Sequence, residues 1–266
     1  MKVLAVETAT SWQSVAVVQG DRVLALVEQD AEGSHARLLM SAIDRALKQA
    51  GLTLRDLQGL AVSNGPGSFT GLRVGLATML GFRAVLGIPL VLVPTLEALA
   101  WRHRDVTGAL VPVLKSRKNE LYWAIYEWLR GGELKVLSPE QVGAPAVLGR
   151  ILAGIVPATL YGEGWLAYRN EIQQSADSKA ALLREVPPDT HRPSAVAVAL
   201  AAGPRFTRGE IAGTSIAPLY VQRPEAEIKF DEQQGQSAVE RRHARVAQKL
   251  GTRKSRPRRP GTKTRT

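Results

Sequence analysis

Short hydrophobic runs alternate with polar turns along the first 30 residues. Runs at 2–7, 12–18 and 22–28 are separated by polar turns at 8–11 and 20–21. Apolar and polar positions in runs of this length, bounded by turn residues, are typical of β-strands. The segment is therefore predicted to form a meander of three antiparallel strands.

A helical pattern follows the strands. Residues 35–50 carry apolar side chains at helical spacing, with Ser34 in the N-cap position and Gly51 just past the end. The elements expected next are a strand near 57–63, a glycine-rich loop at 64–71, a helix to residue 85, a strand at 89–93 and a helix over 95–103. In this order, β-β-β-α-β-α-β-α, an antiparallel hairpin feeds right-handed parallel crossovers. That is the topology of a ribonuclease H-like lobe, of which the actin and sugar-kinase folds contain two.

A second, smaller lobe is predicted to begin near residue 110. LVPVL and LYWAIYEWL predict a hairpin across the polar turn 115–120. The later elements expected are a strand near 133–137, helices near 147–155, 165–174 and 194–206, and a strand at 217–222. The predicted fold class is α/β, with two ribonuclease H-like, actin-like (ASKHA) lobes, the second reduced. The predicted parts are an N-terminal lobe at 1–106, a C-terminal lobe at 107–225 and a tail at 226–266.

The net charge of +11 is concentrated at the end of the chain. From residue 231 to 266 there are eleven Lys and Arg against three Asp and Glu, so the rest of the chain carries only +3. The last fifteen residues contain no Leu, Ile, Val or aromatic side chain. Such a segment buries too little apolar surface to fold, so the tail is predicted to be disordered, either as a solvated extension or as a nonspecific phosphate-binding arm.

The composition excludes several classes of site. With no cysteine, the chain has no disulfide framework, thiolate metal site or cysteine nucleophile, which suits the reducing cytoplasm. The apolar run from Ala84 to Pro94 is about half the length that a membrane helix needs, and Pro89 interrupts it. A cytoplasmic protein without a membrane span is expected.

Two polar segments are candidates for phosphate or nucleotide binding. Glu7, Thr8 and Thr10 form a polar turn after the first strand, where actin-like ATPases place groups near phosphates and magnesium; ordinary hairpin turns look similar. The loop with Gly65, Gly67 and Ser68 leads into a helix whose N–H groups can face an anion. It lacks the lysine of a Walker loop. A tight structural turn that permits close helix packing explains the same glycines equally well.

Several motifs together resemble those of the TsaB (YeaZ) family. They are ETAT after the first strand, HARLL, NGPGSFTGLRVG, PLVLVPTLEALA, NELYWAIYEW, YGEGWLAY and APLYVQRP, and the resemblance spans residues 1–224. It implies the two-lobed actin-like architecture. It also implies a non-catalytic, activating partner of the TsaD-type subunit that makes N6-threonylcarbamoyladenosine at position 37 of tRNA. ATP and an iron or zinc ion would then belong to partner subunits, which include a TsaE-type P-loop ATPase.

The resemblance places the subunit interface on two helices. The residues expected there are His35, Leu38, Leu39, Ala42, Ile43, Gly71, Leu72 and Gly75. The alternative is that both helices simply cover the sheet. Under the interface interpretation, Leu39→Glu should break the complex and leave the fold intact. The same surface makes a homodimer plausible for the isolated chain.

The departures from the family pattern concern catalysis. The family's usual first-turn aspartate is Glu7 here, and the position four residues after His35, where the catalytic subunit has a second metal-binding histidine, is Leu39. The turn 115–120 is basic, with Lys115 and Lys118, where a phosphotransferase of this fold needs an acidic loop. That turn is either a solvated hairpin tip or a contact to the tRNA backbone. No metal or catalytic residue is expected in this chain; the alternative is an actin-like ATP-dependent phosphotransferase that uses Glu7, Thr8 and Thr10.

Overall fold

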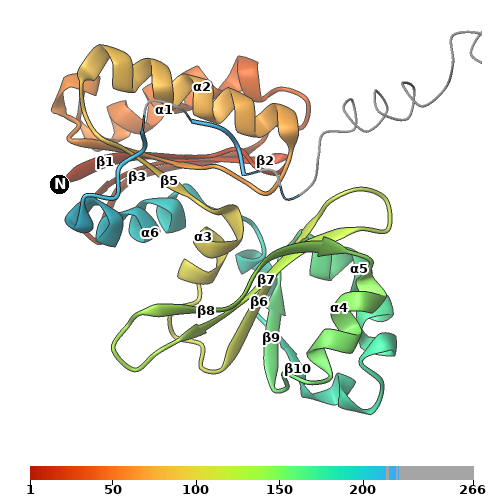
Figure 1. The fold of residues 1–266 in the computed structure, drawn as a ribbon. Coiled ribbons are helices and arrows are strands. Elements are labelled where there is room, and N and C mark those ends of the chain that lie inside the picture. The colour runs from red at the N-terminus through yellow and green to blue at the C-terminus, as the bar shows by residue number, and fades with distance from the viewer. Residues whose placement is uncertain (214–215, 220, 222–266) are drawn as a thin grey trace, which may run out of the picture. The chain divides into compact units, whose positions relative to one another are not determined.

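Two five-stranded mixed sheets carry the fold (Figure 1). The computed structural model describes residues 1–213, 216–219 and 221, and Met1–Gln222 form one compact unit that contains both sheets. The basic tail predicted at 226–266 lies outside the described residues.

The first sheet has the strand order β3-β2-β1-β4-β5. Its strands are β1 (Lys2–Glu7), β2 (Trp12–Gln19), β3 (Arg22–Asp30), β4 (Gly59–Ser63) and β5 (Leu90–Val93). β1 is antiparallel to β2 and parallel to β4, so the predicted hairpin and crossovers are confirmed. Alternate residues of β1 face opposite sides: Leu4 and Val6 belong to one core cluster, and Val3 and Ala5 to another.

Helices cover both faces of this sheet (Figure 1). α1 (His35–Ala50) and α2 (Phe69–Leu86) pack on one face, and α6 (Ala195–Arg208) packs on the other. α1 ends where Gly51 adopts φ +65° and its N–H bonds back to the last turn, as predicted. Ser34 lies at the N-cap of α1, but its side chain makes no capping hydrogen bond. A short 3₁₀ turn, η1 (Leu54–Asp56), precedes β4.

The second sheet repeats the topology of the first. Its order, β10-β9-β6-β7-β8, again places an antiparallel three-strand meander next to two parallel strands. Its elements are β6 (Ala109–Lys115), β7 (Leu121–Trp128), β8 (Leu134–Gly143), α4 (Pro145–Leu152), β9 (Ala158–Tyr161), α5 (Glu163–Ser175), η2 (Asp177–Leu182), β10 (Leu183–Glu185) and η3 (Pro188–Thr190). The lobe is not reduced in strands. Only its crossover helices are shorter, with 8 and 13 residues against 16 and 18 in the first lobe.

Two helices depart from the predicted lobe assignment. α6 was assigned to the second lobe, yet its alanines and Val198 pack against Val3 and Ala5 of the first sheet. α3 (Thr95–Trp101) contacts both sheets, because Ala98 joins the cluster under α6 while Leu96 and Leu99 join the core of the second sheet. The strand predicted at 217–222 is wrong as far as the structure describes it: residues 217–219 and 221 are not in a strand, and Tyr220 and Gln222 lie outside the described residues.

Candidate functional site

The glycine-rich loop lies directly against the turn that follows β1. The Ser68 N–H donates to the Ala9 carbonyl oxygen at 2.6 Å, and the Thr8 hydroxyl donates to the Gly71 carbonyl oxygen at 2.9 Å. A Cβ at Gly67 would overlap the Ala9 carbonyl oxygen, and a Cβ at Gly71 would overlap that of Thr8. These glycines therefore allow the start of α2 to rest on the backbone of the turn.

The start of α2 has already used two of its N–H groups. The Ser68 N–H bonds to Ala9, and the Gly71 N–H donates to the Ser68 side chain at 3.3 Å, which caps the helix. One turn later, a Cβ at Gly75 would overlap the Thr8 hydroxyl oxygen. These contacts favour the structural interpretation of the loop over a phosphate cradle.

Gly65 meets a late segment of the chain. It adopts φ +116°, and a Cβ there would lie 2.7 Å from the Leu219 carbonyl oxygen. The Leu219 N–H donates to the Asn64 carbonyl oxygen at 2.6 Å. This contact replaces the predicted late strand. Nothing in the local sequence marks it, because it joins residues 155 positions apart through backbone atoms.

Glu7 is fully buried at the end of β1, with an exposed fraction of 0%. Burial raises the pKa of its carboxyl group to about 7. Hydrogen bonds from the Ala9 backbone, the Ser63 hydroxyl and the Thr8 backbone lower the pKa, but their effect is smaller than that of burial. The Ala9 N–H donates to Oε1 at 2.5 Å, whereas Oε2 has no partner in hydrogen-bond geometry. The carboxyl group is thus enclosed by the chain rather than presented to a ligand from solution.

A cavity of about 300 Å³ separates the β1–β2 turn and the start of α2 from the predicted basic turn of the second lobe. Of the predicted phosphate-binding residues, Thr10, Gly67 and Ser68 line this cavity; Glu7, Thr8 and Gly65 do not. Its opposite wall includes Lys115, Ser116 and Arg117. The structure therefore brings together only half of the predicted set.

Glu163 also lines this cavity, and sequence reasoning did not identify it. Burial raises the pKa of its carboxyl group, and the charge and backbone N–H of Lys115 act in the opposite direction. Its place at the start of α5, next to Gly162, was visible in the sequence. The pairing with Lys115 required the fold. Among the described residues, no group of three or more His, Cys, Asp or Glu side chains is placed to hold a metal ion.

His35 ties the start of α1 to the same turn. Its Nε2 lies 2.9 Å from the Thr10 carbonyl oxygen, and its Nδ1 lies 3.4 Å from Gln13 Oε1. Burial lowers the pKa of the ring, so the imidazole is neutral at pH 7 and its single proton belongs on Nε2. Exchange of the Gln13 amide positions would then let Nε2 of Gln13, which has no other partner, donate to His35 Nδ1. The histidine is a structural link.

The predicted interface residues are mostly inside the chain. Leu38 is half-buried and the other seven are buried; these are His35, Leu39, Ala42, Ile43, Gly71, Leu72 and Gly75. Leu39 is 1% exposed and belongs to the core of the first sheet, so the expectation that Leu39→Glu leaves the fold intact is wrong. The α1 and α2 side chains that face solvent are different ones, including Met40 and Val85, which are 53% and 83% exposed.

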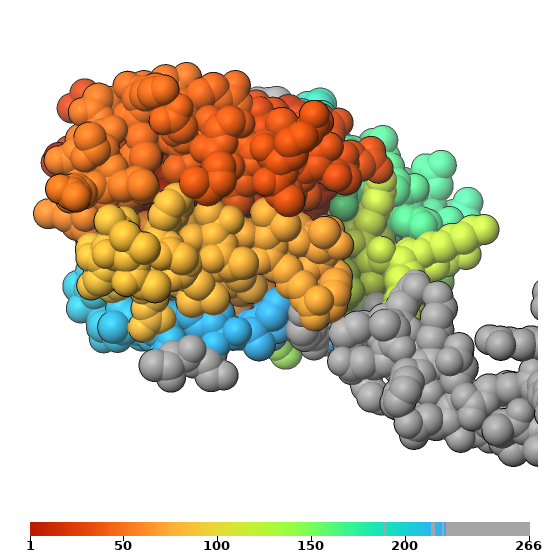
Figure 2. Space-filling view, turned by 90° about the horizontal axis from the view of Figure 1, so that it is seen from above, coloured from red at the N-terminus to blue at the C-terminus, as the bar shows by residue number. Residues whose placement is uncertain are grey.

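α2 also has unusual composition for a surface helix. By length and apolar composition it is the one helix of the described chain that could cross a membrane, with a mean hydropathy of 1.3, although 28% of it is buried against the rest of the protein. It contains Arg73 and Arg83, and Arg73 stacks on Phe69 at 3.6 Å from the ring centroid. Figure 2 shows α1 and α2, in orange and gold, on one face of the molecule.

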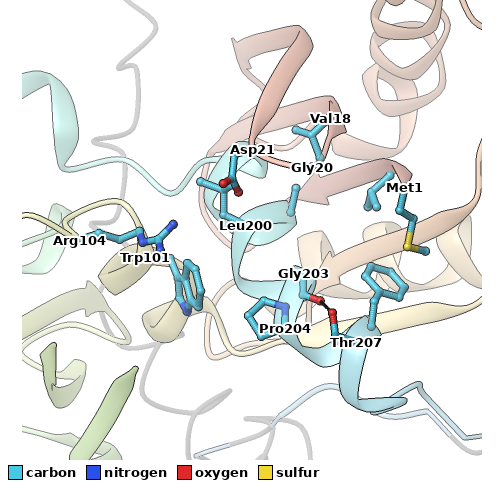
Figure 3. A pocket seen from close by; sticks show the side chains of 13 residues that line it. Met1, Val18, Gly20, Asp21, Trp101, Arg104, Leu200, Gly203, Pro204 and Thr207 are labelled. Atoms are coloured by element: carbon cyan, nitrogen blue, oxygen red, sulfur yellow. Dashed lines mark hydrogen bonds between the residues drawn. The ribbon is translucent and has the colours of Figure 1, made fainter. Parts of the chain in front are cut away.

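A second cavity, of about 350 Å³, lies beside the C-terminal half of α6 (Figure 3). Apolar side chains such as Val3 and Phe206 form much of its wall, and Asp21 and Arg104 are charged groups at its edge. Arg104 stacks on Trp101, 4.8 Å from the ring centroid. No predicted site residue lines this cavity.

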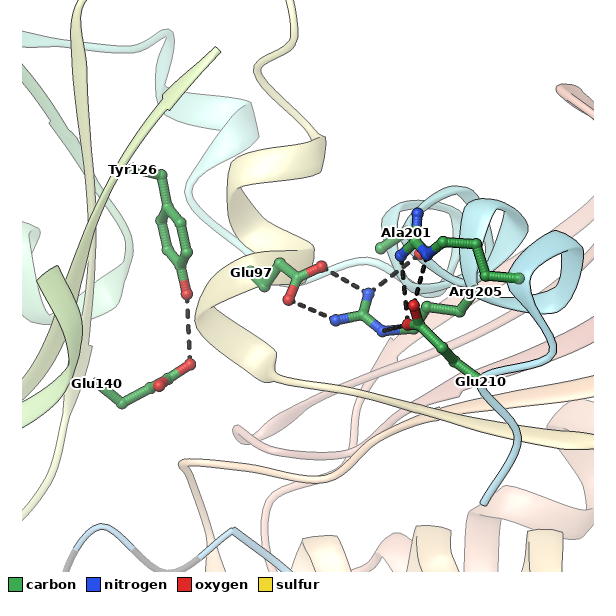
Figure 4. A network of polar contacts seen from close by, with 7 residues as sticks. Glu97, Tyr126, Glu140, Ala201, Arg205 and Glu210 are labelled. Carbon is green, nitrogen blue, oxygen red and sulfur yellow. Dashed lines mark hydrogen bonds and ion pairs between the residues drawn. The ribbon is translucent and has the colours of Figure 1, made fainter. Parts of the chain in front are cut away.

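An ion-pair network joins α3 to α6 (Figure 4). Arg205 donates to both carboxylate oxygens of Glu97, at 2.6 and 2.8 Å, and to the Ala201 carbonyl oxygen at 3.2 Å. Glu210 lies 4.0 Å from Arg205 and also pairs with Arg208. The network holds together two helices and contains no predicted site residue.

Comparison with known proteins identifies relatives over most of the chain. The profile of the TsaD family, described as tRNA N6-adenosine threonylcarbamoyltransferase, matches residues 26–230. The chain is 25% identical over 234 residues to the tRNA threonylcarbamoyladenosine biosynthesis protein TsaB of Bacillus subtilis, covering 88% of this chain and 100% of that protein. It is 30% identical over 172 residues to the Escherichia coli protein of the same description, covering 63% of this chain and 74% of that protein.

Solved structures agree with these relatives. YeaZ from Pseudomonas aeruginosa superimposes with a TM-score of 0.67 at 26% identity, covering 82% of this chain and 99% of that chain. A second Pseudomonas aeruginosa structure, of an uncharacterized protein with similarity to peptidase YeaZ, gives a TM-score of 0.70 at 26% identity and covers 83% and 99%. The two-sheet architecture is thus shared with these proteins.

Proposed function

The chain belongs to the TsaB family of tRNA threonylcarbamoyladenosine biosynthesis proteins, and on this premise we propose that it is the non-catalytic subunit that pairs with a TsaD-like catalytic subunit. In this proposal, the threonylcarbamoyl group is transferred to N6 of adenosine 37 in the TsaD-like subunit. A TsaE-like P-loop ATPase acts with the pair. ATP and the iron or zinc ion belong to those partners.

The observation that carries the proposal is the solvent-facing side of α2. Ala77, Gly81 and Ala84 are exposed and spaced along one side of the helix, followed by Val85 at 83% exposure. A Cβ at Gly81 would meet no atom within 4 Å, so the chain itself does not require glycine there. Met40 of α1 adds a further exposed apolar group. Contiguous exposed apolar surface marks protein interfaces, and small side chains let a partner helix approach closely.

The β1–β2 turn supports a role without catalysis. The Glu7 carboxyl group and the Thr8 hydroxyl, which a phosphotransferase would offer to magnesium and phosphate, are buried and bonded to the chain itself. Across the cavity, Lys115 stands where such an enzyme would place an acidic group. These residues support the packing of α2 on the turn, and through it the proposed interface.

A binding experiment with three variants tests the interface. Val85→Glu and Gly81→Arg place charge on the solvent side of α2 and should abolish co-elution with the TsaD-like subunit in size-exclusion chromatography. Val136→Glu is the matched control, because Val136 is 54% exposed on β8 of the second sheet and should leave the complex intact. All three should keep the wild-type melting temperature. Co-elution of both α2 variants at wild-type affinity would show that the interface lies elsewhere.

A cellular measurement tests the function itself. Depletion of the protein should deeply reduce N6-threonylcarbamoyladenosine in bulk tRNA, measured by nucleoside mass spectrometry. Wild type and Val136→Glu should restore it, and Val85→Glu should not. Unchanged nucleoside levels, together with magnesium-dependent ATP hydrolysis by the isolated chain that Glu7→Gln removes, would instead support an actin-like phosphotransferase.

A further inference from the structure

The cavity beside α6 is lined by two opposite charges that are not paired with each other (Figure 3). Asp21 lies in the turn between β2 and β3, and Arg104 lies just after α3. In the part of the chain that the structure describes, the Asp21 carboxylate has no hydrogen bond or ion pair, and the Arg104 guanidinium has only ring contacts. Its Cζ lies 4.8 Å from the ring centroid of Trp101 and 5.7 Å from that of Trp128. Stacking of this kind orients a guanidinium and leaves its N–H groups free for an anion.

The neighbouring helix adds a backbone acceptor that the helix itself does not use. Pro204 lies inside α6 and has no N–H, so the carbonyl oxygen of Leu200, four residues earlier, lacks its usual helical donor. Both residues line the cavity. In Figure 3, Asp21, Leu200 and Arg104 lie on one side of the cavity and Met1 lies on the other. A carboxylate and a carbonyl acceptor together suit an ammonium group, which has three donors.

The rest of the wall is largely apolar. Met1, Val3, Val18 and Phe206 contribute to it; both valines are buried and Phe206 is half-buried. The volume of about 350 Å³ is near the lower end of the range for small-molecule pockets, roughly 300–1,000 Å³. Burial of an apolar group in such a cavity supplies binding free energy, and a few polar groups at its edge fix the orientation of the ligand.

We propose that this cavity binds a free α-amino acid with an apolar side chain. The ammonium group pairs with the Asp21 carboxylate and the Leu200 carbonyl oxygen, and the carboxylate pairs with Arg104. The side chain packs against the apolar wall. A zwitterion meets both charges of the cavity, whereas a simple amine or a simple carboxylate meets only one. No lining residue belongs to α1 or α2, so the inference does not depend on the proposed subunit function.

Isothermal titration calorimetry of the full chain tests the site, with L-leucine, L-methionine and L-phenylalanine as probes. At least one of them should bind. Leucine methyl ester lacks the carboxylate and N-acetyl-L-leucine lacks the ammonium group, so each should bind about tenfold more weakly than L-leucine. Asp21→Asn and Arg104→Gln should each weaken binding of the amino acid by a similar factor, about tenfold. Asp44→Asn is the matched control, because Asp44 is an exposed carboxylate that does not line the cavity, and it should leave the affinity unchanged.

A variant that fills the cavity gives an independent measurement. Gly203 of α6 lines the cavity, and a Cβ there would meet no atom within 4 Å. Gly203→Leu should therefore melt at or above the wild-type temperature and lose binding. Absence of binding of all three amino acids to the wild type at millimolar concentrations would overturn the proposal. So would binding of both leucine derivatives as tightly as L-leucine, or wild-type affinity in Asp21→Asn and Arg104→Gln or in folded Gly203→Leu.

Discussion

At the scale of single residues, what surrounds each glycine decides its role. A glycine-rich loop before a helix predicts either a phosphate cradle or a close approach of two backbones, because both need the missing side chain. The structure resolves the choice at Gly67 and Gly71, where a Cβ would overlap the carbonyl oxygens of Ala9 and Thr8. The motif could be found from the sequence, but the atoms it avoids could not, since they belong to a turn some 60 residues earlier.

The buried Glu7 carboxyl group leads to a pH-dependent prediction. Its folded-state pKa of about 7 lies above the ordinary 4.5, so the folded state keeps a proton that the unfolded state releases. Its contribution to stability is therefore present below pH 4.5 and is lost as the pH rises to 7. The free energy of unfolding of Glu7→Gln, relative to that of the wild type, should therefore rise by about 3 kcal/mol between pH 4.5 and pH 7. Urea unfolding from pH 4 to 8.5 measures it; a constant difference between the two proteins would contradict the assignment.

At the scale of elements, hydrophobic periodicity identified which side chains are buried but not what they contact. The spacing of Leu39 and Ile43 predicted α1, and both lie in its buried stripe. They were also expected at a subunit interface, but in the structure both side chains pack in the core of the first sheet and are not exposed to a partner. β9 and β10, with four and three residues, were missed because they are too short to show a period.

The two long helices of the first lobe offer a matched test of capping. Ser68 and Ser34 both occupy N-cap positions, but only the Ser68 side chain accepts a backbone N–H, from Gly71. Ser68→Ala should lower the free energy of unfolding by about 1 kcal/mol. Ser34→Ala should change it little, since no capping bond is lost. Urea denaturation of both variants measures the contrast, and equal losses would mean that the Ser68 bond is not formed in solution.

At the scale of the whole molecule, the chain order and the packing order differ. The β-β-β-α-β-α-β-α order made the first sheet predictable from sequence, whereas only the three-strand meander of the second sheet was predicted. The pattern did not show that α6, which follows the second sheet, returns to the first. The buried alanines of α6 indicate that the helix packs closely against a neighbouring element. Alanine spacing does not specify which of the two sheets that element belongs to, and in the structure it is the first sheet. α3 has the same ambiguity, and the structure resolves it by placing Ala98 in one core and Leu99 in another.

Because α3 takes part in both cores, the two sheets should unfold together. The Glu97–Arg205 pair, whose side chains are 16% and 20% exposed, ties α3 to α6. Glu97→Gln leaves Arg205 without its closest carboxylate and should lower the free energy of unfolding by about 1–2 kcal/mol. Asp44→Asn is the control, because the Asp44–Lys48 pair is exposed and should contribute little. Urea unfolding followed by tryptophan fluorescence and circular dichroism should show one coincident transition, at lower urea for Glu97→Gln. Two separate transitions would mean that α3 does not couple the sheets, since each would then lose its structure at its own denaturant concentration.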